Sequence, residues 1–226
     1  MIRAAVFDLW GTLVHSPGGD PYLALRDSLT EAQREYFAAL KQDAQSRVHP
    51  DAATFLAGWA APLGLDPARL DEFAGIFRAA EAEAACFPEA LEALARARQV
   101  ARLGLLSNTQ SFGMGFLDRL GLVPLIPNRF LSAHTGFRKP QPEAFEAVQK
   151  KLGLFPGELI MIGDSWQDDV QGALQAGWTA VWLNRAGRPR PEHDPEAELV
   201  EVSSLAQVPE VIENLQAGAR CSTCLG

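Results

Sequence analysis

Three short apolar runs of the sequence each end in side chains that can do chemistry. The runs at residues 2–7, 101–106 and 159–162 are followed by Asp8, by Ser107 and Asn108, and by Gly163 and Asp164. Carboxylate oxygens can act as nucleophiles or as ligands of hard cations, and hydroxyl and amide groups can bind oxyanions. One aspartate after a strand is usually a turn residue or a helix cap. Three such ends in one chain favour a shared site.

The segments around these runs predict an α/β fold. From about residue 88, strand-like apolar runs alternate with helix-like segments, and a further buried strand is expected at residues 179–183. Such alternation is typical of a doubly wound, Rossmann-like parallel sheet with helices on both faces. The carboxyl ends of its strands meet at one edge, where ligands bind. We therefore expect the three polar ends to converge.

Residues 16–86 have a helical pattern instead. One amphipathic helix is expected over residues 22–40, a second is expected to begin at Asp51, and a third follows Asp66 and Pro67. We expect residues 1–15 and 87–226 to form the α/β core domain, and residues 16–86 to form a helical domain inserted after the first strand.

Composition and charge exclude several classes of protein. The 226 residues are 47% hydrophobic, and 20 basic against 28 acidic residues give a net charge of −8. This apolar content argues against a disordered chain, and an acidic chain is a poor partner for nucleic acid or for an anionic membrane surface. No apolar run is long enough to span a membrane, and three cysteines are too few for a disulfide framework. We expect a cytoplasmic protein.

Four motifs, in chain order, resemble those of the haloacid dehalogenase superfamily of hydrolases. They are Phe7-Asp8-Leu9-Trp10-Gly11-Thr12-Leu13, Leu106-Ser107-Asn108-Thr109, Arg138-Lys139-Pro140, and Gly163-Asp164-Ser165 with Asp169 and Gly172-Ala173. The resemblance covers residues 2–14 and 88–184, and the helical insertion resembles the family's helical cap. It implies a hydrolase whose substrate is a small phosphorylated molecule and which is a monomer or a homodimer.

The resemblance assigns a role to each motif residue. Asp8 would be the nucleophile, and Lys139 would neutralise charge on the nucleophile and the substrate. Thr12, Ser107 and Asn108 would bind the transferring phosphoryl group. Asp8, Lys139 and Ser107 are thus the expected catalytic residues.

The resemblance also implies Mg²⁺. The carboxylates of Asp8, Asp164 and Asp169 and the backbone carbonyl of Trp10 would be its ligands. The residue types agree, because these three aspartates and Asp168 would otherwise crowd against Lys139 alone. Like charges that close raise one another's pKa, so a divalent cation is expected among them.

Trp10 is the clearest departure from the phosphatase pattern. The superfamily's phosphatases have a second aspartate there, which protonates the leaving oxygen and later activates water. Its absence leaves three hypotheses open: a phosphatase suited to good leaving groups, a 2-haloacid dehalogenase, or a weak member that binds a phosphorylated ligand or a partner. Trp10 is expected to line the pocket or the cap interface.

Four further features are given no catalytic or metal-binding role. Lys41 is expected to be a solvated surface lysine, and His15 a surface residue of a linker. Cys221 and Cys224 are read as part of a tail, despite their metal-like spacing. The net charge of −5 over residues 16–86, from six basic and eleven acidic residues, argues against multiply charged substrates.

Overall fold

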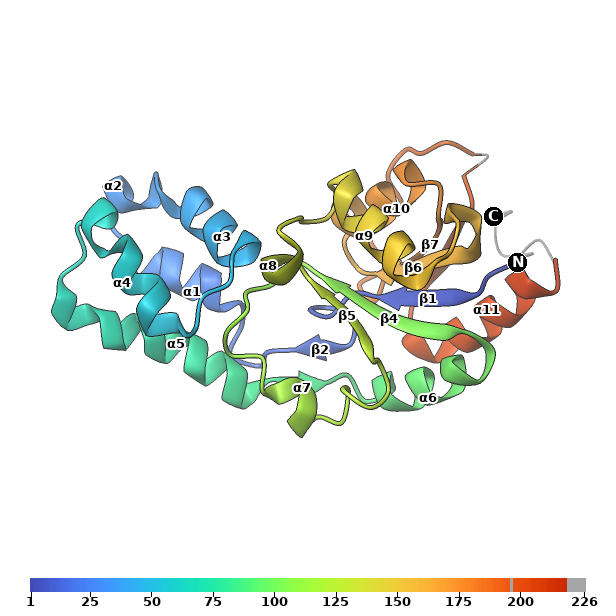
Figure 1. Ribbon diagram of the computed structural model, residues 1–226, viewed down its shortest axis with the longest axis horizontal. Coiled ribbons are helices and arrows are strands. Elements are labelled where there is room, and N and C mark those ends of the chain that lie inside the picture. Colours follow the sequence, from blue (N-terminus) through green and yellow to red (C-terminus); the bar gives the residue numbers. More distant parts are fainter. Residues whose placement is uncertain (196, 219–226) are drawn as a thin grey trace.

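A six-stranded parallel sheet forms the centre of one half of the molecule (Figure 1). The computed structural model describes residues 1–195 and 197–218. In spatial order, the strands are β5 (Asn128–Leu131), β4 (Arg102–Ser107), β1 (Ala4–Phe7), β6 (Leu159–Gly163), β7 (Thr179–Leu183) and β8 (Leu199–Val202). All five neighbouring pairs are parallel, so the predicted doubly wound sheet is confirmed.

Helices cover both faces of this sheet (Figure 1). On one face lie α6 (Ala90–Val100) and α11 (Val208–Gln216), and on the other lie α9 (Pro142–Leu152) and α10 (Gly172–Gln175). Successive residues of β1 serve the two faces in turn, because side chains alternate along a strand. Ala5 and Phe7 belong to the apolar cluster with α6 and α11, whereas Ala4 and Val6 belong to the cluster with α9.

The helical segment lies beside the sheet and has its own apolar cluster (Figure 1). Its helices are α1 (Pro21–Asp27), α2 (Glu31–Arg34), α3 (Phe37–Ser46), α4 (Ala52–Leu63) and α5 (Leu70–Glu83). The chain enters through β2 (Val14–His15) and leaves through β3 (Ala85–Cys86), which pair as antiparallel strands. That residues 16–86 form a separate domain stays a prediction.

One predicted helix is wrong in extent. The helix expected over residues 22–40 is three helices, because Ser28 ends α1 and Thr30 begins α2 with a reciprocal capping box to Gln33. After β4, the chain forms only the short helix α7 (Phe116–Arg119) before β5. Gly113, with a φ of +66°, adopts a left-handed conformation just before α7.

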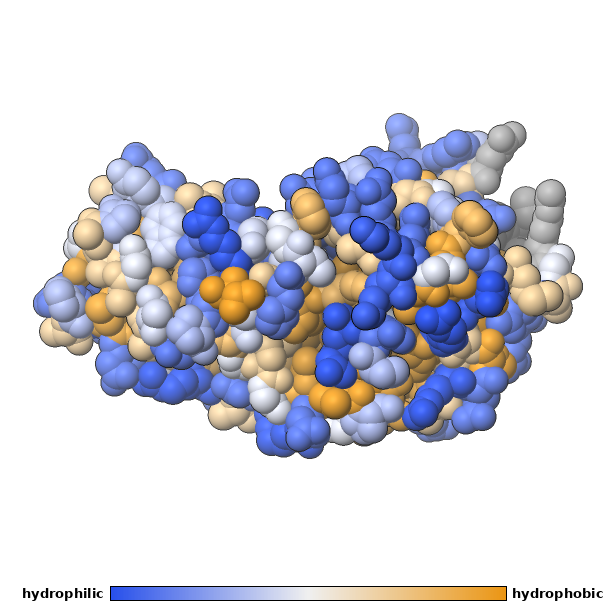
Figure 2. All heavy atoms as spheres, in the orientation of Figure 1, coloured by the Kyte–Doolittle hydropathy of each residue, from blue (hydrophilic) through white to orange (hydrophobic). Residues whose placement is uncertain are grey.

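Short elements complete the described chain. They are α8 (Ser132–Thr135), a π-helical turn at Trp166–Gln171, and 3₁₀ turns at Pro67–Arg69, Pro156–Glu158 and Leu205–Gln207. Within the described ranges, none of the helices has the length and apolar character that crossing a membrane would require. Hydrophilic and hydrophobic residues are intermixed on the face shown in Figure 2.

Phe112 joins the two halves of the molecule. It follows the loop after β4, yet it belongs to the apolar cluster of the helical segment and is only 5% exposed. Its ring centroid lies 5.6 Å from that of Phe55 and 5.5 Å from that of Phe77. The expected core domain therefore supplies a side chain to the core of the helical segment.

We predict that Phe112→Ala lowers the free energy of unfolding by about 3–5 kcal/mol, the usual loss when a buried phenylalanine is removed. Urea unfolding measures this. The matched control is Phe155→Ala, because Phe155 is 78% exposed and its removal should change stability by less than about 0.5 kcal/mol. Equal losses in the two variants would show that Phe112 does not hold the halves together.

Candidate active site

The polar ends of β1, β4 and β6 meet in one cavity of about 420 Å³. It lies between β1 and β6, where the strand order reverses and doubly wound sheets bind ligands. The expected site residues that line it are Asp8, Trp10, Ser107, Asn108, Lys139, Asp164 and Asp169, and Asp168 lines it too. The chain thus brings these residues together, while their catalytic roles stay predictions.

Lys139 bridges two of the carboxylates. Its Nζ donates to Asp8 Oδ1 and to Asp169 Oδ1, both at 2.6 Å, and its side chain is only 2% exposed. Burial alone would lower the pKa of Lys139, but the charges of Asp169 and Asp8 raise it above its usual value. The ammonium group therefore stays charged and fixes both carboxylates.

Asn108 holds the main chain of Lys139 in place. Its Nδ2 donates to the Lys139 carbonyl at 2.8 Å, and the Lys139 amide donates to its Oδ1 at 2.8 Å. Both the Nδ2 and the Oδ1 of Asn108 are thus hydrogen-bonded to the backbone of Lys139. The structure gives Asn108 a positioning contact, and its expected contact with substrate stays a prediction.

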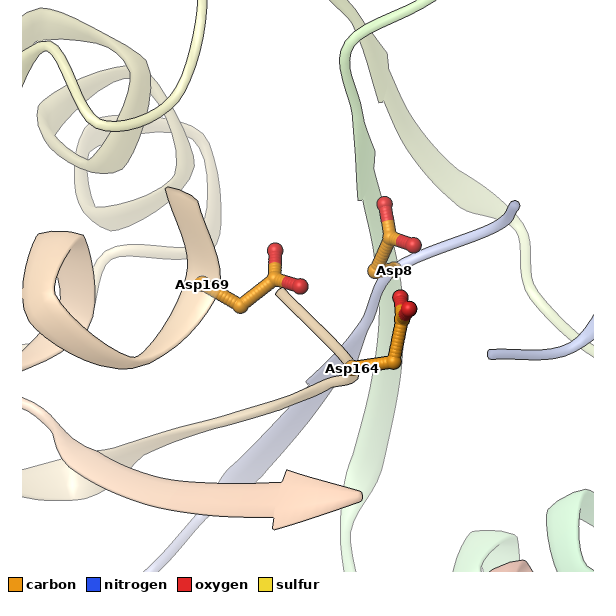
Figure 3. Close-up of side chains that lie close together, drawn as sticks. All are labelled: Asp8, Asp164 and Asp169. Carbon is orange, nitrogen blue, oxygen red and sulfur yellow. The ribbon is translucent and has the colours of Figure 1, made fainter. Parts of the chain in front are cut away.

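Asp8, Asp164 and Asp169 form a cluster of acidic groups (Figure 3). Each offers an oxygen, and these oxygens all lie within 4.8 Å of one another. Burial and, after it, the charge of Asp8 raise the pKa of Asp164 to about 6. Burial also raises the pKa of Asp169, against the opposing effect of Lys139. Ionising these buried carboxylates therefore costs free energy, and a further cation beside them would lower that cost.

The cluster fits a magnesium ion by the type of its donor atoms, and two glycines leave space for its carboxylates. Carboxylate oxygens are the ligands that Mg²⁺ prefers. Two glycines let the carboxylates approach the backbone: a Cβ on Gly11 would lie 2.7 Å from Asp164 Oδ2, and one on Gly163 would lie 2.1 Å from Asp169 Oδ2. The expected role of the Trp10 carbonyl as a ligand stays a prediction.

Trp10 lines the cavity and is anchored by its ring. Its indole N–H donates to Thr109 Oγ1 at 3.3 Å, and its ring centroid lies 5.1 Å from that of Phe116. The position next to the expected nucleophile therefore holds an aromatic ring and no proton-transferring group, as the sequence indicated.

Thr12 contacts a carboxylate of the acidic cluster. It is fully buried and is not among the residues that line the cavity. Its hydroxyl donates to Asp164 Oδ1 at 3.4 Å, so it supports a candidate metal ligand, and its expected contact with substrate stays a prediction. Ser107 does line the cavity, although it is only 1% exposed.

Lys41 and His15, which the sequence placed at the surface, both line the cavity, and the Lys41 side chain remains 31% exposed. Lys41 lies on α3, which packs over the site, and His15 lies on β2, with its ring centroid 4.9 Å from that of Phe87. The expectation for Cys221 and Cys224 falls outside the described residues.

Several lining residues were given no role from the sequence, among them Tyr22, Gln45, Gln110 and Arg138. Tyr22 Oη donates to Gln110 Oε1 at 3.1 Å, and Gln45 Nε2 donates to the Asn108 carbonyl at 3.1 Å. Arg138 stands inside a motif and Gln110 directly follows one, which was an available signal. Tyr22 and Gln45 carried none, because only packing brings their helices to the site.

Curated relatives match parts of the chain. A phosphoserine phosphatase of Thermus thermophilus is 34% identical over 162 residues, which are 63% of this chain and 61% of that protein. The pyrimidine 5'-nucleotidase YjjG of Escherichia coli is 30% identical over 137 residues, covering 59% of this chain and 60% of the relative. The chain thus spans less than two thirds of the length of these relatives.

Solved structures share the fold over nearly the whole chain. A 2-haloacid dehalogenase from Pseudomonas syringae has a TM-score of 0.69 at 23% identity and covers 95% of this chain and 100% of its own. The putative hydrolase YfnB of Bacillus subtilis, described as bound to magnesium, has a TM-score of 0.64 at 22% identity and covers 93% and 98%.

A family model described as haloacid dehalogenase-like hydrolase matches residues 2–177, a range that contains the sheet strands β1 to β6 and every residue of the acidic cluster. The chain therefore belongs to the haloacid dehalogenase-like hydrolases.

Proposed function

We propose that this hydrolase is a magnesium-dependent phosphatase that acts on small organophosphates through a phosphorylated Asp8. The observation that carries the proposal is the buried Lys139, which holds Asp8 and Asp169 beside Asp164 at the switch point of the sheet. The names of the curated relatives support it, since they describe phosphatases or a nucleotidase for chemically different substrates.

The chemistry proceeds in two steps. A carboxylate oxygen of Asp8 bonds to phosphorus, and the ester bond breaks with its electron pair on the leaving oxygen. Water then attacks the phosphorus, releasing phosphate and restoring Asp8. Lys139 keeps Asp8 oriented through Oδ1 during both steps, and Ser107 offers a hydroxyl in the cavity. A magnesium ion held by Asp8, Asp164, Asp169 and the Trp10 carbonyl would neutralise charge on the phosphate and the nucleophile.

A 2-haloacid dehalogenase is the second candidate, and Trp10 favours it. A halide leaves without a proton, so an aromatic residue at that position is no handicap. The acidic cluster argues against a dehalogenase. Attack of Asp8 on carbon has no use for Asp164 and Asp169, although their burial, which raises their pKa values, costs free energy. A weak member that only binds phosphorylated ligands is the third candidate, and the absence of turnover with retained ligand binding would identify it.

We predict that Mg²⁺ raises the melting temperature. At a concentration of one hundred times Kd, a ligand of the folded state increases the free energy of unfolding by about 2.7 kcal/mol. Asp164→Asn should abolish this shift, whereas Asp118→Asn, at an exposed position on α7, should retain it. Differential scanning fluorimetry at constant ionic strength measures both. The same melting temperature in EDTA and in Mg²⁺ would contradict the metal site.

The magnesium shift should also depend on pH. The pKa of Asp164 in the folded protein, about 6, lies above its value in the unfolded chain. Stability from the protonated group is therefore present at low pH and is lost as pH rises through about 6. The metal-free protein should become less stable over this range, and Mg²⁺ should stabilise it more at about pH 7.5 than at about pH 5. A larger shift at the lower pH would contradict this assignment.

We predict that Asp8→Asn lowers phosphatase activity by roughly 10⁴-fold or more, because an amide cannot replace the nucleophile. Its melting temperature should show that it still folds, and it should still bind ligand. The exposed Asp118→Asn is again the matched control. Wild-type hydrolysis by Asp8→Asn would exclude a covalent step at this residue.

Trp10 generates the last prediction of this section. Since its side chain cannot protonate a leaving oxygen, aryl and acyl phosphates should be cleaved far faster than alkyl phosphates. A plot of log kcat/KM against leaving-group pKa should therefore be steep. Trp10→Asp should flatten it, with the largest gain for alkyl esters, within the roughly 10²–10⁴-fold range of acid–base catalysis.

Two results bear on this prediction. Loss of the Trp10 ring can open the pocket, so the melting temperature of Trp10→Asp serves as the folding control. Rapid cleavage of an alkyl phosphate by the wild-type protein, without leaving-group dependence, would show that another group donates the proton. His15 and Asp20 would be the first to replace, because both line the cavity.

A further inference from the structure

Arg138 brings a positive charge to the cavity, where it opposes the effect of burial on the pKa of Asp168. It lines the cavity next to Lys139, and none of the ion pairs among residues 1–195 and 197–218 includes it. Its Nε is buried and has no hydrogen-bond partner in that part of the chain. An arginine in this position costs free energy unless something else completes its contacts.

Two residues of α3 face the same cavity. Lys41 and Gln45 are one turn apart and so share a face of the helix. Gln45 is only 5% exposed; its Nε2 donates to the Asn108 carbonyl, while its Oε1 is buried and has no partner among the described residues. A buried, unpaired acceptor in a cavity indicates a missing donor.

Lys41 is only loosely paired. Its Nζ lies 3.8 Å from Asp20 Oδ2, beyond hydrogen-bond distance, and 5.3 Å from the centre of the Tyr22 ring. The other oxygen of Asp20 already accepts the Tyr22 amide at 2.8 Å, as the N-cap of α1. Asp20 therefore pairs loosely with one of the two cations at this end of the cavity.

Tyr22 cannot compensate the other cation. Burial raises the pKa of its phenol well above the usual value, Asp20 raises it further, and Arg138 opposes them. Tyr22 is therefore a neutral donor, and its hydroxyl is already used by Gln110. At this end of the cavity, Arg138 and Lys41 thus have no carboxylate within hydrogen-bond distance among the described residues.

We propose that this end binds a carboxylate of the substrate through Arg138 and Lys41, while Gln45 Oε1 accepts a hydrogen bond from a neighbouring hydroxyl or ammonium group. The inference rests on the proposed function, and it narrows the substrate class to small phosphate esters that also carry a carboxylate. A guanidinium group suits a carboxylate because it can donate two parallel hydrogen bonds. The net charge of the helical segment, which argued against such substrates, does not decide the matter, since most of those charges lie outside the cavity.

The test is a binding measurement that does not need turnover. Asp8→Asn protein with Mg²⁺ is titrated calorimetrically with 3-carboxyphenyl phosphate and with 3-carbamoylphenyl phosphate, which differ only in a carboxylate or a neutral amide of similar size. We expect the carboxylate ester to bind about tenfold more tightly, the value of one charged hydrogen-bonded contact. Equal affinities, or no binding of either ester, would overturn the inference.

Variants assign the effect to residues. Arg138→Gln in the same background should bring the two affinities within about twofold, and Lys41→Gln should reduce the preference in part. Arg138→Lys keeps the charge and should retain part of the preference, which guards against a folding defect in Arg138→Gln. Lys150→Gln, at an exposed position on α9, should leave the ratio unchanged. A preference that survives both Arg138→Gln and Lys41→Gln would also overturn the inference.

Hydrolysis of both esters by the wild-type protein separates the two proposals. Turnover together with equal affinities would leave the phosphatase in place and remove the carboxylate site. A carboxylate preference that depends on Arg138, without turnover of either ester, would keep the site and remove the phosphatase.

Discussion

The pairing of one buried lysine with two carboxylates constrains the rest of this structure. Removing charges from water costs several kcal/mol per ion and is offset only by close, fully hydrogen-bonded partners. Lys139 has such partners in Asp8 and Asp169, each at 2.6 Å. Asn108 fixes the Lys139 main chain, and the missing side chain of Gly163 makes room for Asp169. The loops after three strands are thus built around one ammonium group.

The ion pair also explains why the site calls for another cation. Lys139 contacts Asp8 and Asp169 but not Asp164, whose pKa is raised by burial and by Asp8. Lys139 and Arg188 lower the pKa of Asp164 without overcoming the effect of burial, so a proton or a further cation would stabilise this carboxylate. The proposed metal binding and its pH dependence therefore have one physical cause, the incomplete compensation of the cluster's charge.

Sequence patterns predicted the part of the cavity at the strand ends better than the part formed by the helical segment. Buried parallel strands are marked by continuous apolar runs, and strand order places their carboxyl ends together, so Asp8, Ser107 and Asp164 could be grouped in advance. The helical side depends on tertiary packing. The 22–40 periodicity did not show the break that the Thr30 capping box makes, and nothing local indicated that Lys41 would line a cavity. A charge on an amphipathic helix predicts exposure only until another element packs over it.

Trp10 has a structural consequence as well as a chemical one. Its indole N–H donates to Thr109 Oγ1, the Thr109 hydroxyl donates to Gln110 Oε1, and that oxygen also accepts from Tyr22 of α1. An aspartate at position 10 has no N–H with which to begin this series of bonds. The residue that replaces the acid–base group of the phosphatase pattern is therefore tied to the helical segment. That segment also carries Lys41 and Gln45, so one series of hydrogen bonds connects the surroundings of Asp8 with the part of the chain that supplies the helical side of the cavity.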